Sequence, residues 1–171
     1  MYQVAESSVR DQRLTMRVLA HWRTFADGRT FPRRSQIDAQ RLGTDWSNCF
    51  MIDLDPILER SRFGYVGENL RDPAWPTFER QYIADCLENT LLQLATSYIE
   101  RVVARRMVIS VGGTGIHLGT QIIYRSVLLP LSENDDRIDG ILGAANFREI
   151  PGGESIHESQ ELAVVLPGRD H

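Results

Sequence analysis

The N-terminal part of the chain carries apolar residues at helical spacing. One stripe recurs at intervals of three and four residues and contains Leu14, Val18, Trp22 and Phe25. Ser7 or Ser8 offers an N-terminal cap, and Gly28 lies just past the last apolar position. Because residues at this spacing share one face of an α-helix, the pattern predicts an amphipathic helix that ends near Ala26.

Further along, short apolar runs between turn residues predict strands. The runs with the length and composition of strands span residues 48–54, 63–66, 107–111, 121–131 and 137–147. Asp55 and Pro56 close the first run, and the five-residue polar segment 132–136 joins the last two as a hairpin connection. A later apolar patch, 162–166, predicts a docked segment or an edge strand.

Between the second and third runs lies the most regular helical pattern of the chain. Apolar residues step by three and four from Ile83 to Val102, and arginines gather at the C-terminal end, where positive charge suits the helix dipole. This pattern predicts one long helix over 82–105, with short helices from about Thr77. The segment 29–45 has no sustained period and is expected to form loop or short helical turns.

The resulting order is one helix, two strands, further helices and three strands. Hairpin-type links dominate, so the order predicts an α+β fold with an antiparallel sheet. We divide the chain into an N-terminal helix (1–28), a domain (29–148) and a C-terminal tail (149–171). The core residues expected between the sheet and the long helix are Phe50, Ile52, Leu87, Leu91, Leu94, Tyr98, Val127, Leu129, Ile141 and Leu142.

Charge and composition narrow the function classes. All 19 basic residues are arginine, which excludes chemistry that depends on lysine, such as Schiff-base formation or a phosphate-loop lysine. The net charge of −4 argues against a nucleic-acid binder, because phosphate neutralisation needs a basic surface. No signal peptide or membrane-spanning run stands out, and Cys49 and Cys86 are the only cysteines, so we expect a cytoplasmic protein with reduced thiols.

Three motifs look like known sites but lack what those sites need. The glycine-rich segment 112–115 has Leu118 where a dinucleotide fingerprint needs glycine, and a strand follows it rather than a helix, so we expect a flexible hairpin turn between strands. Asp53 and Asp55 close a strand before a proline and are expected to form a turn. The histidines lack metal-ligand spacing, so we predict no metal site and no cofactor.

Several segments, taken in order, resemble one known family. They span residues 21–23, 31–38, 46–53, 63–67, 124–131 and 138–144. The family is that of small single-domain PAS proteins from alphaproteobacteria, and the resemblance covers residues 20–148. It implies a PAS-like five-stranded antiparallel sheet with helices packed on one face, here preceded by the N-terminal amphipathic helix. It also implies a sensory or protein-interaction role, and it supplies no catalytic residues.

The resemblance favours a stand-alone, non-catalytic module of bacterial signal transduction that acts through contacts with other signalling proteins. Whether a small ligand binds in its core stays open. The alternative is a small-molecule enzyme of the ketosteroid-isomerase-like cone fold, with Asp53 as base and Tyr124 as hydrogen-bond donor. Strand order separates the two, because in a PAS sheet the strand 48–54 lies between the second and last strands. A third alternative is an adaptor that packs its core completely and binds only protein.

The run 121–131 supplies the candidate ligand-binding residues. Both of its alternating faces are apolar except at Tyr124, Arg125 and Ser126. A charged arginine in such a strand needs a carboxylate, an anionic ligand or solvent. A plain salt bridge or an exposed edge satisfies this need, and the sharper hypothesis is that Tyr124 or Arg125 orients a small ligand inside the fold.

The stripe on the N-terminal helix supplies a candidate dimer interface. An apolar surface of this size is seldom left in contact with water on a soluble monomer. The four residues Leu14, Val18, Trp22 and Phe25 therefore pack either on the chain's own sheet or against a second copy. We expect a homodimer in which the helix and outer sheet face of each copy cover each other, because two-fold symmetry makes such self-complementary patches common.

Overall fold

The structure is a computed structural model that describes residues 3–72, 80–151 and 164–165, with the side chains of the first helix from Leu14 onward. Its strands form one antiparallel sheet in the order β2-β1-β5-β4-β3-β6. They are β1 (Cys49–Asp53), β2 (Arg62–Val66), β3 (Ile109–His117), β4 (Thr120–Leu131), β5 (Gly140–Glu149) and β6 (Val164–Val165). The predicted α+β fold with a five-stranded antiparallel sheet is confirmed, and the predicted edge strand of the tail adds β6 beside β3.

The position of β1 in this sheet separates the two fold alternatives. β1 lies between β2 and β5, and its register pairs Met51 with Tyr65 on one side and with Leu142 on the other. This is the order expected for a PAS sheet. The cone-fold alternative is therefore not supported.

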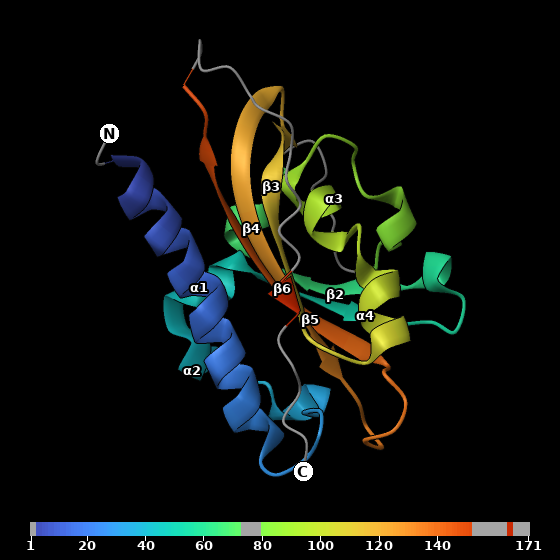
Figure 1. The fold of residues 1–171 in the computed structure, drawn as a ribbon. Helices are drawn as coiled ribbons and strands as arrows, with labels where there is room; N and C mark the ends of the chain where they lie inside the picture. The colour runs from blue at the N-terminus through green and yellow to red at the C-terminus, as the bar shows by residue number, and fades with distance from the viewer. Residues whose placement is uncertain (1–2, 73–79, 152–163, 166–171) are drawn as a thin grey trace.

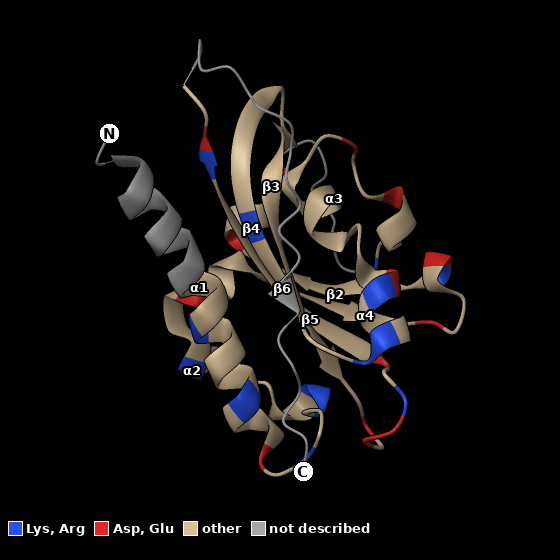
Figure 2. Cartoon of the chain, in the orientation of Figure 1, with Lys and Arg blue, Asp and Glu red and all other residues tan. Residues whose placement is uncertain are grey.

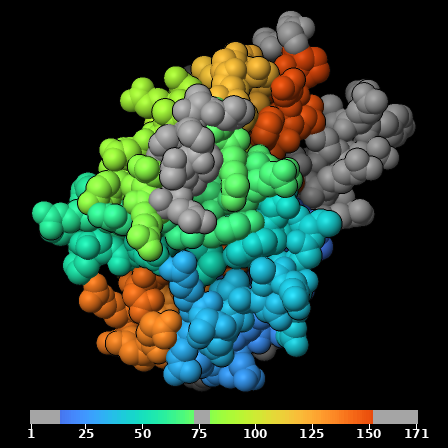
Figure 3. All heavy atoms as spheres, turned by 180° about the vertical axis from the view of Figure 1, so that it is seen from behind, coloured from blue at the N-terminus to red at the C-terminus, as the bar shows by residue number. Residues whose placement is uncertain are grey.

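Helices cover both faces of the sheet. They are α1 (Gln3–Ala26), α2 (Ala39–Leu42), α3 (Leu91–Thr96) and α4 (Ile99–Arg105). The expected cap at Ser7 or Ser8 is wrong, because α1 begins at Gln3 and both serines lie inside it. Short 3-10 segments are η1 (Arg34–Gln36), η2 (Gly43–Asn48), η3 (Leu58–Arg60), η4 (Glu68–Leu70) and η5 (Ile83–Asp85). In Figure 1, α1 runs along one face of the sheet, and α3 and α4 lie over the other. From behind, much of the visible surface comes from the chain between α1 and α3 (Figure 3).

The predicted long helix over 82–105 is wrong, because the chain breaks it into η5, α3 and α4. Asn89 takes a left-handed backbone conformation (φ 57°), which an asparagine tolerates and which ends a right-handed helix. Thr90 then caps α3 through a hydrogen bond from the backbone N–H of Gln93 to its hydroxyl, 3.2 Å long. The apolar spacing continues across the break because both short helices face the same sheet. The short helices predicted from Thr77 begin outside the described residues.

The glycine-rich segment is part of β3, so the prediction of a turn at 112–115 is also wrong. The turn lies further on, at Leu118 and Gly119, which both have positive φ (51° and 79°) as a two-residue hairpin turn requires. A Cβ at Gly115 would come within 2.5 Å of the Leu94 side chain. This glycine therefore lets α3 lie close to the strand rather than ending it.

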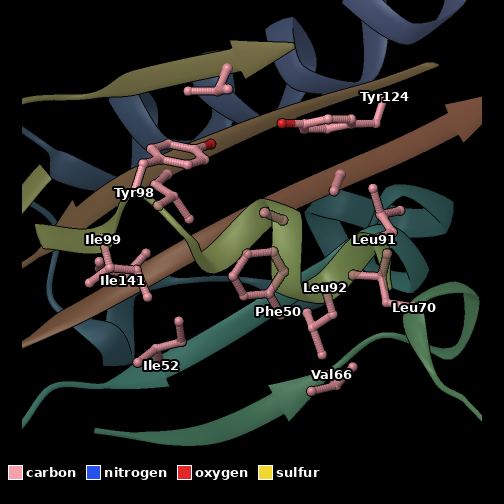
Figure 4. Packing of buried hydrophobic residues seen from close by; sticks show 14 of the residues in the cluster. Phe50, Ile52, Val66, Leu70, Leu91, Leu92, Tyr98, Ile99, Tyr124 and Ile141 are labelled. Atoms are coloured by element: carbon pink, nitrogen blue, oxygen red, sulfur yellow. The ribbon is translucent and has the colours of Figure 1, made fainter. Parts of the chain in front are cut away.

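The two faces of the sheet carry two separate apolar clusters. The cluster under α3 and α4 includes Phe50, Ile52, Leu91, Tyr98 and Ile141, several of which are drawn in Figure 4. The cluster under α1 includes Val127, Leu129 and Leu142, which we had expected on the other face. Leu87 and Leu94 are partly exposed, and the other predicted core residues are buried.

The stripe on α1 packs against the chain's own sheet. Leu14, Val18, Trp22 and Phe25 are all less than one-tenth exposed in the single chain. The indole N–H of Trp22 donates a hydrogen bond of 2.9 Å to the carbonyl of Pro130 on β4, and the Arg17 guanidinium pairs with the Asp45 carboxylate at 2.7 Å. These contacts bury the stripe without a second copy, and the homodimer stays a prediction.

Replacement of Leu91 by alanine tests the packing of α3 on the sheet. Leu91 is 1% exposed, so we expect Leu91→Ala to lower the free energy of unfolding by about 2–5 kcal/mol in urea denaturation. The control is Met16→Ala on the exposed side of α1, where the side chain is 61% exposed and a change within about 0.5 kcal/mol is expected. Equal losses in the two variants would mean that α3 does not cover the core.

Candidate functional site

Alternation along β4 divides the three predicted site residues between the two faces. Tyr124 belongs to the apolar cluster under α3 and α4, and Ser126 bonds a residue of that cluster. Arg125 points to the α1 side, because successive side chains of a strand face opposite ways. Figure 2 shows it as the single charged position on β4. The structure therefore brings Tyr124 and Ser126 together and separates Arg125 from them.

Buried hydroxyl groups form a polar centre between the sheet and the short helices. The phenol oxygen of Tyr98 lies 2.8 Å from the hydroxyl of Ser126, and Ser126 donates to the carbonyl of Val111 at 3.1 Å. Since the Ser126 proton is used on Val111, Tyr98 acts as the donor to Ser126. Tyr98 and Ser126 are 1% and 0% exposed. In Figure 4 the phenol oxygen of Tyr124 points toward that of Tyr98. We call Tyr98, Tyr124 and Ser126 the hydroxyl cluster.

The hydroxyl cluster is neutral. Burial raises the pKa of the Tyr98 phenol well above its usual range, and the hydrogen bond with Ser126 only partly offsets this. Phenol and alcohol groups of this kind donate and accept hydrogen bonds. The cluster is therefore suited to orienting an uncharged polar group rather than to proton abstraction at neutral pH.

Arg125 faces a second polar position that the sequence did not single out. The register places Arg125 between Gly112 on β3 and Asn146 on β5. The Asn146 side-chain oxygen is buried and has no hydrogen-bond partner among the described residues. Within the same described residues, Arg125 joins no ion pair either. The position of Asn146 beside Arg125 could be predicted only from the register of β4 and β5.

Asp53 and Tyr124 do not form a common site. Asp53 pairs with Gly140 across β1 and β5, whereas Tyr124 pairs with Phe147. The two positions are thus seven residues apart along β5, or roughly 24 Å at about 3.4 Å per residue. Asp53 is also exposed and pairs with Arg34. The base and donor of the enzyme alternative are therefore not brought together in one site.

A surface groove lies on the outer side of the short helices. It has a volume of about 690 Å³ and is lined by residues that include Leu58, Cys86 and Ile99. Burial raises the pKa of the Cys86 thiol to about 11, so this cysteine is a neutral thiol at physiological pH. The groove is separate from the hydroxyl cluster, whose residues are not in its lining.

The residues that the structure describes form neither a metal centre nor a membrane-spanning helix. Among them, no group of three or more His, Cys, Asp or Glu side chains is placed to hold a metal ion. No helix in this part of the chain combines the length and the apolar character that crossing a membrane requires.

Comparison with known proteins agrees with the strand order. A family model described as a PAS domain matches residues 10–146, which include α1 from Arg10 onward, β1 to β4 and most of β5. No curated protein matches the chain. Because the matched region spans most of the sequence, the chain belongs to the PAS domain family.

Proposed function

We propose that this PAS domain is a non-catalytic sensory module that holds a small ligand at the hydroxyl cluster. It serves bacterial signal transduction in the cytoplasm, as one of the small alphaproteobacterial PAS proteins that its sequence resembles. The observation that carries the proposal is the buried contact between Tyr98 and Ser126, 2.8 Å apart in an otherwise apolar cluster. Tyr98 and Ser126 are already paired with each other and with the Val111 carbonyl, so a ligand with a hydroxyl or carbonyl group would exchange for one of these bonds.

The chemistry of the cluster defines the ligand class. Tyr98, Tyr124 and Ser126 are uncharged donors and acceptors, and the side chains around them are apolar. The matching ligand is a small, uncharged molecule with hydroxyl or carbonyl groups and an apolar body. Arg125 would attract an anion instead, but it faces the α1 side and takes no part in this site.

The site also couples a ligand to the surface of the protein. Tyr98 directly precedes α4, and Ser126 lies on the central strand β4. A ligand that takes over the hydrogen bond between them shifts the position of α4 relative to the sheet. The output then passes through contacts of that surface with other signalling proteins, since the module itself carries out no reaction.

Native mass spectrometry of the purified protein tests the ligand proposal. We expect a bound small molecule that is released on denaturation, and its affinity is then measured by calorimetry. Tyr124→Phe and Ser126→Ala should each weaken binding about three- to tenfold, the value of one neutral hydrogen bond. Arg125→Gln is the matched control on the other face of β4 and should leave the affinity unchanged. An equal loss with Arg125→Gln would place the ligand elsewhere, and wild-type protein without any bound molecule would favour the adaptor.

We also propose that the protein forms a homodimer by exchange of α1. The contacts of Leu14, Val18, Trp22 and Phe25 with the sheet can be made within one chain or between two. The helix turns back at Asp27 and Gly28, which both have positive φ (47° and 82°). If this turn opens, each α1 reaches the outer sheet face of a second copy, and the same apolar contacts form across a two-fold axis.

Sedimentation at micromolar concentration tests the exchange. We expect a species of twice the 19.5 kDa chain mass. Gly28→Ala should tighten the dimer about fivefold or more, because a left-handed conformation costs an alanine about 1–2 kcal/mol and the open form relieves it. Gly119→Ala is the matched control, since Gly119 also has positive φ (79°) and open space for a Cβ but lies in the β3–β4 turn. A monomer in wild type and in Gly28→Ala contradicts the proposal.

A further inference from the structure

The tip of the β3–β4 hairpin is joined to the start of α3 by two hydrogen bonds. The backbone N–H of Leu91 donates to Nδ1 of His117 at 2.8 Å. The backbone N–H of Leu118 donates to the carbonyl of Asn89 at 3.0 Å. Asn89 and Leu118 both have positive φ, so each segment holds a constrained conformation to make this contact. We call the pair of bonds the hairpin latch.

One of these bonds depends on the protonation state of His117. An imidazole nitrogen that accepts a hydrogen bond carries no proton, so the neutral ring has its proton on Nε2. Protonation adds a second N–H at Nδ1, which then faces the N–H of Leu91. Two donors cannot pair, and the bond is lost.

The surroundings of His117 favour the neutral ring. Burial lowers its pKa below the usual value, and the charge of Asp72, which acts in the opposite direction, only partly offsets this. The ring also lies against Phe147 of β5, with 4.8 Å between the ring centroids. The α3 side contributes an uncharged leucine. Asp72 is therefore the charged group that acts on His117 among the described residues, and it is itself mostly buried.

We propose that the hairpin latch is pH-sensitive. Protonation of the His117 imidazole releases the first turn of α3 from the sheet. That turn carries Leu91 and Leu92, which are 1% and 3% exposed and cover the same apolar cluster that contains Tyr124. Release therefore loosens the cover of the α3 side of the sheet. The latch works whether or not a ligand binds, so it stands independently of the proposed function.

The direction of the effect follows from linkage. Because the pKa of His117 is lowered by folding, the latched state binds fewer protons than the open state. The stabilisation is complete above the unfolded pKa of about 6.5 and is lost as the pH falls through the folded pKa. Between these two pKa values, the equilibrium constant for opening rises by up to about tenfold for each unit by which the pH falls.

Nuclear magnetic resonance of the full chain tests the latch. Nitrogen chemical shifts of ¹⁵N-labelled histidine should show His117 as the Nε2–H tautomer at pH 7.5. The protection of the Leu91 amide against hydrogen exchange, corrected for intrinsic exchange rates, should fall as the pH is lowered and the His117 ring becomes protonated. His117→Asn places a non-titrating oxygen in the position of Nδ1 and should keep Leu91 protected down to pH 5.5. His21→Asn, in α1, is the control and should behave as wild type.

Two results would overturn the proposal. One is a proton on Nδ1 of His117 at pH 7.5, which is measured on wild type and so needs no folded variant. The other is an equal loss of Leu91 protection between pH 7.5 and 5.5 in wild type and His117→Asn.

Discussion

The sheet of this protein must be covered on both faces, and the rest of the fold follows from that requirement. Leu128 and Leu129 are neighbours on β4, point to opposite faces, and are both fully buried. Antiparallel sheets often leave one face to water. Here α3 and α4 cover one side, and α1 must cover the other. The first helix therefore shares a core with the sheet rather than preceding it as a separate element.

Burial on both faces also explains why the polar residues of β4 are informative. A strand with one solvent-exposed face can carry polar side chains there without a desolvation penalty. Because both faces of β4 are covered, its polar groups need hydrogen-bond partners within the protein or solvent. Ser126 finds Tyr98 and the carbonyl of Val111. Arg125 lies on the α1 side of β4, directly opposite the polar residue Asn146 of β5. The two faces of one strand thus present two different chemistries, neutral toward α3 and α4 and cationic toward α1.

The sequence predicted what depends on local pattern and missed what depends on distant contacts. The stripe on α1, the positions of the strands and the α+β class were visible in spacing alone. Tyr124 and Ser126 stood out because they interrupt an apolar strand. Tyr98 was expected only as a core residue, because its bond with Ser126 joins positions 28 residues apart. The distance between Asp53 and Tyr124 was likewise set by strand register, which no periodicity reveals.

Two of the wrong predictions of local structure have a common cause. The helix over 82–105 was predicted without a break, and β3 was predicted to end before Gly112. In the structure the helix breaks at Asn89, and β3 continues to His117. Leu118 bonds Asn89, and Leu91 bonds His117. Each bond needs the helix to start late and the strand to end late, so one tertiary contact overrides both local patterns. The strongest departure from the sequence pattern therefore lies at the contact that fixes α3 to the sheet.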